Sequence, residues 1–104
     1  MRHIIQSSET KAALREIHAY TANHWDMAQA AKYHLQFKAT FNKLAKNPAL
    51  GHMNPEMPED YRIYPIGSHW VVYRANAREL FVIAIVHHAM DIESRIKTLT
   101  KKYH

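Results

Sequence analysis

A run of seven apolar residues, from Leu80 to Val86, is the longest hydrophobic stretch of the chain, and it ends at His87 and His88. A helix that spans a bilayer needs about 20 apolar residues, so this run is too short to cross a membrane. Its length and its content of Val and Ile favour a strand that is buried on both faces. We therefore predict a central strand over residues 80–87, followed by a final helix that begins at Asp91.

Two segments ahead of Pro48 repeat apolar residues at helical spacing. The first is capped by Ser7 or Ser8 and ends near His24, and the second begins at Asp26. The predicted stripe of the first helix is Leu14, Ile17, Thr21 and Trp25. The predicted stripe of the second helix is Ala30, Tyr33 or His34, Phe37, Phe41 and Leu44. The two helices should form a hairpin whose apolar stripes pack on another layer.

The rest of the chain carries strand patterns on either side of short turns. Residues 61–66 and 69–75 flank Gly67-Ser68, which has the chemistry of a two-residue hairpin turn. A second turn at residues 76–79 leads into the central strand, so three strands form an antiparallel meander, and a further short strand precedes the first helix. The predicted fold is α+β in the order β-α-α-β-β-β-α, with an N-terminal helical hairpin packed on a small, mainly antiparallel sheet.

Composition narrows the class of protein and the kind of partner. The length of 104 residues, 47% of them apolar, predicts one domain over residues 1–104. The chain has no cysteine, which excludes disulfides and thiolate chemistry. The first residues lack the apolar run of a signal peptide, so we expect a cytoplasmic protein. The formal net charge of +5 favours an acidic partner, either nucleic acid or protein.

Four stretches of the chain resemble a known family. They are HAYTANHWDMAQAAKYHLQF in the helical hairpin, AKNPALG after it, YRIYPIGSHWVVYRA in the strand hairpin, and VIAIVHHAMDIESRIKTL at the end. In their order and spacing, the chain resembles ParE toxins of the RelE/ParE superfamily of type II toxin–antitoxin systems. The resemblance implies a non-enzymatic toxin without a cofactor, which inhibits DNA gyrase. It also implies that a ParD-like antitoxin neutralises the toxin and can form larger assemblies with it.

The RelE branch of the superfamily supplies an alternative function, ribosome-dependent cleavage of messenger RNA. Attack by a ribose 2′-oxygen needs a base, an acid and positive charge near the phosphate. RelE-like nucleases carry several Lys or Arg residues in the first meander strand, whereas residues 61–66 offer only Arg62. His87 and His88 are the acid–base candidates. Because neighbouring strand residues point to opposite faces, they can share a site only if the strand ends between them.

We therefore assign no catalytic residue, and keep Arg62, His87 and His88 for the ribonuclease alternative. The structural interpretation of the two histidines is that one imidazole bonds Asp91 or a helix end while the other is solvated. A third hypothesis is a family member that has lost toxicity and only binds antitoxin.

Other side chains are candidates for binding partners. Tyr20, Trp25 and Tyr33 are large, partly polar and close to the helical hairpin, so we predict that they contact the antitoxin. The predicted target-binding residues are His87, Asp91, Arg95, Lys101 and Lys102. No metal site is expected, because the nine histidines are scattered and lack carboxylates at the spacing that a metal site requires.

Overall fold

The computed structural model describes residues 1–88 of the chain. Its elements are β1 (His3–Gln6), α1 (Ser8–His24), α2 (Met27–Lys46), the short 3₁₀ helix η1 (Pro48–Leu50), β2 (Arg62–Ile66), β3 (His69–Ala75) and β4 (Glu79–His87). These elements confirm the predicted order as far as the third meander strand. The predicted final helix, with Asp91, Arg95, Lys101 and Lys102, lies outside the described residues.

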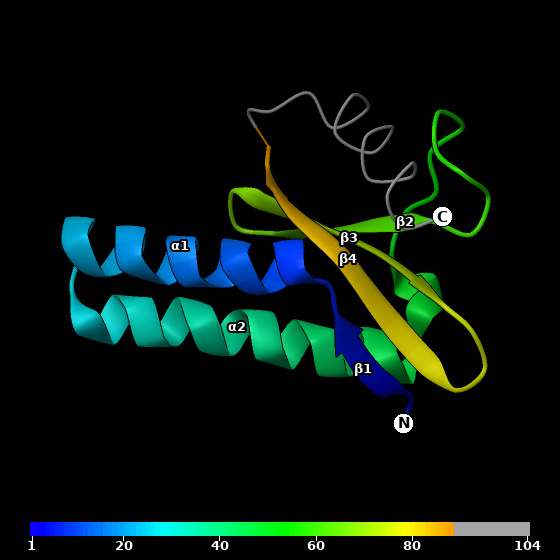
Figure 1. Cartoon of the computed structure of the whole chain (residues 1–104), viewed down its shortest axis with the longest axis horizontal. Coiled ribbons are helices and arrows are strands. Elements are labelled where there is room, and N and C mark those ends of the chain that lie inside the picture. The colour runs from blue at the N-terminus through cyan, green and yellow to red at the C-terminus, as the bar shows by residue number, and fades with distance from the viewer. Residues whose placement is uncertain (89–104) are drawn as a thin grey trace.

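The four strands form one mixed sheet in the order β1-β4-β3-β2. The meander of β2, β3 and β4 is antiparallel, as predicted, and β1 adds to the far side of β4 in parallel. Strand β4 is therefore an inner strand with a neighbour on each side (Figure 1). The α+β fold class predicted from the sequence is confirmed.

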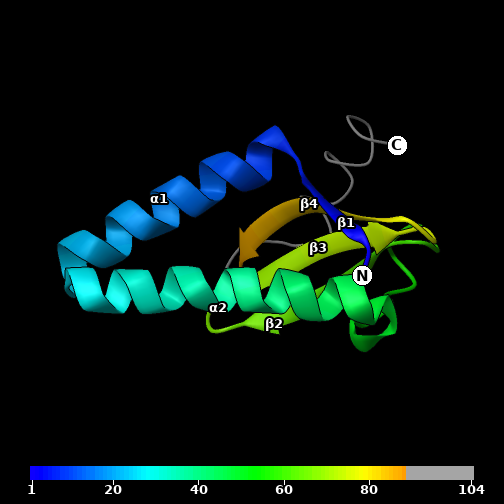
Figure 2. The ribbon, with the colours of Figure 1, turned by 90° about the horizontal axis from the view of Figure 1, so that it is seen from below.

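The helices begin at the residues that the sequence marks as caps. Ser7 accepts a hydrogen bond from the backbone N–H of Thr10 at the start of α1. Asp26 accepts one from the backbone N–H of Gln29, at 2.7 Å, at the start of α2. Each cap satisfies one of the backbone donors that a helix N-terminus leaves unpaired. Only two residues separate α1 from α2, so the helices fold back on each other as a hairpin (Figure 2).

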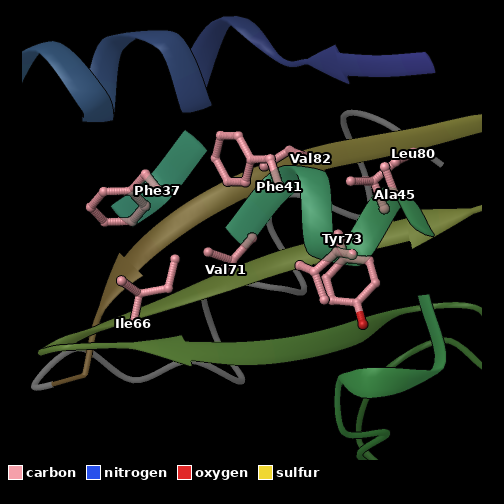
Figure 3. Packing of buried hydrophobic residues seen from close by; sticks show 9 residues of the cluster. Phe37, Phe41, Ala45, Ile66, Val71, Tyr73, Leu80 and Val82 are labelled. Carbon is pink, nitrogen blue, oxygen red and sulfur yellow. The ribbon is translucent and has the colours of Figure 1, made fainter. Parts of the chain in front are cut away.

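The main core lies between α2 and one face of the sheet (Figure 3). Its buried members are Phe37, Phe41, Leu44, Ala45, Ile66, Val71, Tyr73, Leu80 and Val82. A second cluster occupies the other face of the sheet and consists of Met57, Tyr61, Ile63, Val72, Ile83, Ala84 and Val86. Both faces of β4 are thus covered, as its uninterrupted apolar sequence predicts.

Helix α1 is less buried than its apolar pattern predicts. Thr10 is its only buried residue, whereas Leu14 and Ile17 are half-buried. Trp25, which the spacing placed on the apolar stripe, is 69% exposed, so that part of the prediction is wrong. The reason is geometric: the tip of the helical hairpin projects beyond the sheet, and nothing in the described chain packs over it (Figure 1).

Candidate binding groove

A groove of about 910 Å³ opens between the projecting helical hairpin and the end of the sheet where β2 turns into β3. Tyr20 and Trp25 line it from α1 and its end, Tyr33 from α2, and His69 and His87 from the sheet. The remaining lining residues are Glu16, Ile17, Thr21, Gln29, Lys32, Gln36, Gly67 and Ser68. The three residues predicted to contact an antitoxin therefore meet in one cavity, which is within the size range of ligand sites.

Two aromatic side chains at the groove are exposed to solvent. Tyr20 is 61% and Trp25 is 69% exposed. The ring of Tyr20 stacks on that of His24 one helical turn away, with centroids 4.0 Å apart. Exposed aromatic groups of this size beside a cavity are typical of a surface that a protein partner covers.

The third aromatic residue, Tyr33, forms part of the groove wall. Its hydroxyl donates a hydrogen bond to the carbonyl of Ile66 at 3.2 Å and lies 2.8 Å from Nδ1 of His69. Burial raises the pKa of Tyr33, so the phenol stays neutral at physiological pH. The contact with Ile66 joins the hairpin of helices to the hairpin of strands.

A bulge in β4 determines which histidine faces the helices. Tyr73 pairs with Val82, but the preceding residue Val72 pairs with Ala84, so Ile83 has no partner on β3. One unpaired residue reverses the alternation of all the residues after it. His87 consequently pairs with His69 and lies on the groove side, where an unbroken alternation would have placed His88.

Three imidazoles gather at this end of the sheet and form what we call the histidine cluster: His69, His87 and His88. The rings of His69 and His87 meet edge to face with centroids 5.1 Å apart, and those of His87 and His88 stack at 4.9 Å. Strand β4 ends at His87, so the two consecutive histidines do come together, which is the condition that the sequence analysis set. His88 then turns to the strand hairpin, with its backbone N–H and its Nδ1 both bonded to the carbonyl of Ser68.

The surroundings of His69 disfavour protonation of its ring. Burial lowers the pKa of His69, and the nearby His87 and His88 lower it further. His69 is therefore neutral in the free protein at pH 7, while its Nδ1 is held against the Tyr33 hydroxyl.

Comparison with known proteins identifies the family. A model described as the ParE toxin of the type II toxin–antitoxin system parDE matches residues 4–92. This chain belongs to the ParE toxin family. Toxin ParE1 of Caulobacter vibrioides is 31% identical over 90 residues, which cover 86% of this chain and 93% of the relative. Toxin ParE1 of Mycobacterium tuberculosis is 29% identical over 91 residues, with the same coverage.

A solved structure supports the fold independently. The chain matches one titled as the chromosomal ParDE toxin–antitoxin system from P. aeruginosa with a TM-score of 0.70, covering 84% of this chain and 96% of that one. The sequence identity is 15%, so this match concerns the fold alone.

The predicted family is confirmed by the family model and the sequence relatives. The protein is a ParE-type toxin of a ParDE toxin–antitoxin system, and an antitoxin is its expected partner. ParE toxins are not enzymes, so the family also supports the non-enzymatic assignment.

In this ParE-family chain, the residues kept for the ribonuclease alternative are not assembled. Arg62 donates from its guanidinium to the carbonyl of Gly51 at 3.0 Å and pairs across the sheet with Tyr73. His87 pairs with His69, which precedes Tyr73 by four positions on β3. At about 3.3 Å per residue, Arg62 and His87 lie about 13 Å apart along the strand direction.

Within residues 1–88, no group of three His, Cys, Asp or Glu side chains is placed to hold a metal ion. The same described part of the chain contains no helix long and apolar enough to cross a membrane.

The residues that sequence reasoning missed at the groove are His69 and Ser68. Counting back from the 76–79 turn would have placed His69 opposite Val86, and only the bulge brings it to His87.

Proposed function

We propose that this protein inhibits DNA gyrase and that a ParD-like antitoxin neutralises it by binding in the groove. One observation carries the antitoxin part of the proposal. The groove combines a cavity of about 910 Å³ with the exposed rings of Tyr20 and Trp25, and the tip of the helical hairpin has no other cover within the described chain.

The groove suits a segment that folds as it binds. An amphipathic helix places side chains three and four residues apart on one face, and such side chains can anchor in a groove between helices and a sheet. A tail that is disordered alone gains its order from this apolar contact. The net charge of +5 on the toxin favours an acidic antitoxin.

Binding in the groove also offers a route to neutralisation. His87 is exposed at the groove end and is among the residues we propose for target contact, together with Asp91, Arg95, Lys101 and Lys102. An antitoxin segment seated against His87 would cover that part of the surface. Target and antitoxin would then compete for the toxin.

The antitoxin contact is tested by a matched pair of truncations. Trp25→Ala removes an exposed ring at the groove, and Leu35→Ala removes an exposed apolar side chain, 62% exposed, that does not line it. If Trp25 is an anchor, its truncation should weaken antitoxin binding by about 2 kcal/mol, which is about 30-fold. Leu35→Ala should change the dissociation constant less than twofold. Equal effects of the two substitutions would contradict the groove assignment.

The target is tested by adding the pure toxin in parallel to a gyrase supercoiling reaction and to ribosome-bound messenger RNA. Inhibited supercoiling with intact message supports the proposal. Cut message with normal supercoiling overturns it in favour of the RelE-type ribonuclease with Arg62, His87 and His88. If neither reaction responds while the antitoxin still binds, the protein is a family member that only binds antitoxin.

A further inference from the structure

We propose that the histidine cluster binds a carboxylate side chain of the antitoxin segment in the groove, and that the complex takes up a proton as it forms. This inference rests on the proposed function, since it concerns the occupant of the same groove. It adds the chemistry of one contact and a dependence of affinity on pH.

The hydrogen bonds of the cluster fix where the protons of two rings lie. A carbonyl oxygen only accepts hydrogen bonds, so the 2.8 Å contact between Nδ1 of His88 and the Ser68 carbonyl places a proton on that Nδ1. The Tyr33 hydroxyl can donate to the Ile66 carbonyl and accept from Nδ1 of His69. Both contacts persist when the rings are protonated, and each ring then presents a second N–H, at Nε2, to an incoming acceptor.

The charge around the cluster favours an anionic ligand. The ionisable groups that line the groove are Glu16 and Tyr20 on α1, Lys32 and Tyr33 on α2, and His69 and His87 on the sheet. His88 stacks on His87 beside them. The electrostatic effects that lower the pKa of His69 come from His87 and His88. Within residues 1–88, neither His69 nor His88 is paired with a carboxylate. An arriving carboxylate therefore meets the His69 ring, which has no carboxylate partner within residues 1–88, in a groove that the cationic Lys32 also lines.

A bound carboxylate would change the protonation of the cluster. In the free toxin, burial and the neighbouring His87 and His88 keep His69 neutral at pH 7. A carboxylate within hydrogen-bonding distance favours the charged form and raises the pKa of the ring that it touches. A ring that is neutral before binding and charged after it takes one proton from solvent. Affinity should then rise as the pH falls, by as much as about tenfold per pH unit for one proton.

The experiment measures antitoxin binding by titration calorimetry, with the antitoxin that is encoded with this toxin as the probe. Titrations at pH 7 in phosphate and in Tris, which differ in ionisation enthalpy, give the number of protons taken up. Titrations at pH 6 and pH 8 give the change in affinity. We expect uptake of between about half a proton and one proton, and a dissociation constant about tenfold to a hundredfold lower at pH 6 than at pH 8.

Three variants locate the effect. His69→Gln/His88→Gln should reduce the ratio of dissociation constants between the two pH values to below twofold. His69→Gln alone keeps a hydrogen-bonding side chain at this position and keeps the test valid if the double variant is poorly folded; it should at least halve the proton uptake. His52→Gln, an exposed histidine away from the groove, is the matched control and should behave as wild type. Proton uptake that survives in the double variant, or affinity without pH dependence in the wild type, overturns the inference.

The design separates this inference from the proposed function. If Trp25→Ala weakens binding while the affinity is independent of pH, the antitoxin occupies the groove but the carboxylate contact is refuted. If Trp25→Ala leaves binding unchanged, the groove assignment itself fails. Replacing each Asp or Glu of the antitoxin segment by its amide completes the test, since one such substitution should abolish the pH dependence by itself.

Discussion

Tyr73 is the residue whose hydroxyl joins the end of α2 to the sheet, and its removal has a calculable effect. The side chain is fully buried, and its hydroxyl donates to the carbonyl of Pro48 at 2.6 Å and accepts from the backbone N–H of Gly51 at 2.8 Å. Figure 3 shows this hydroxyl pointing from the core toward η1. Burial raises the pKa of Tyr73, so the phenol remains a neutral donor.

Tyr73→Phe keeps the ring in the core but leaves the Gly51 N–H and the Pro48 carbonyl without this partner. A lost hydrogen bond contributes about 1 kcal/mol, and a buried donor left unsatisfied costs about 1–3 kcal/mol. We expect Tyr73→Phe to lower the free energy of unfolding by about 2–3 kcal/mol. In a domain of this size that corresponds to a fall in Tm of about 10–20 °C.

Gly51→Ala tests the same contact from the other side. The conformation of Gly51 is extended and open to any residue, but a methyl group there would overlap the Tyr73 hydroxyl and lie 2.8 Å from its ring carbons. Because both substitutions break the same two hydrogen bonds, the double variant should be at least about 1 kcal/mol more stable than the sum of the single effects predicts.

The measurement is urea unfolding of the single and double variants, with Tyr64→Phe as the control. Tyr64 is half-buried, and its hydroxyl accepts a hydrogen bond from the exposed Lys43 ammonium at 2.9 Å, so its loss should cost no more than about 0.5 kcal/mol. If Tyr73→Phe costs as little as Tyr64→Phe, or if the effects of Tyr73→Phe and Gly51→Ala simply add, our account of this junction is wrong.

Three further predictions concern the cap, the turn and the histidine cluster. Ser7→Ala removes the α1 cap and its 2.6 Å bond to the Ile83 carbonyl, and should cost about 1–2 kcal/mol in urea unfolding. Gly67→Ala places a side chain at a φ of +53° and 2.8 Å from the Tyr33 hydroxyl, so it should cost at least about 1 kcal/mol; an unchanged Tm would contradict this reading of the turn. The lowered pKa of His69 means that the folded protein binds this proton less tightly than the unfolded chain, so the stability of the free toxin should fall as the pH drops below 6.5; a similar fall in His69→Gln would refute it.

Most of the elements follow from local sequence, and the residues show why. Asp26 caps a helix because its short carboxylate reaches the N–H of Gln29, an interaction within four residues of chain. Gly67 permits the turn because its φ is positive. The seven apolar residues of β4 require cover on both faces whatever their neighbours are. Each of these predictions depends on a few adjacent residues and not on distant packing.

The groove depends on relations that adjacent residues do not encode. The apolar stripe of α1 predicts burial, and it does so equally for Ile17, which is half-buried, and for Trp25, which is exposed. What separates them is the length of the hairpin relative to the sheet, which is a property of the whole fold. The predicted antitoxin contacts came from size and position along the hairpin, and the structure places all three in one groove, while their role stays a prediction.

The bulge in β4 connects the fold to the groove, because the same segment fixes a helix and orients a histidine. At this point the carbonyl of Ile83 accepts the Ser7 hydroxyl, and the carbonyl of Val82 accepts the Thr10 hydroxyl at 3.1 Å. The start of α1 is thereby fixed to β4 where the alternation reverses, and the reversal brings His87 to the groove. The apolar run of Val, Ile and Ala gives no local sign of the bulge. With or without the bulge, the strand would bury equally apolar side chains on both faces of the sheet. The polar residues that bond to the carbonyls of this segment, Ser7 and Thr10, lie more than 70 positions away in the sequence.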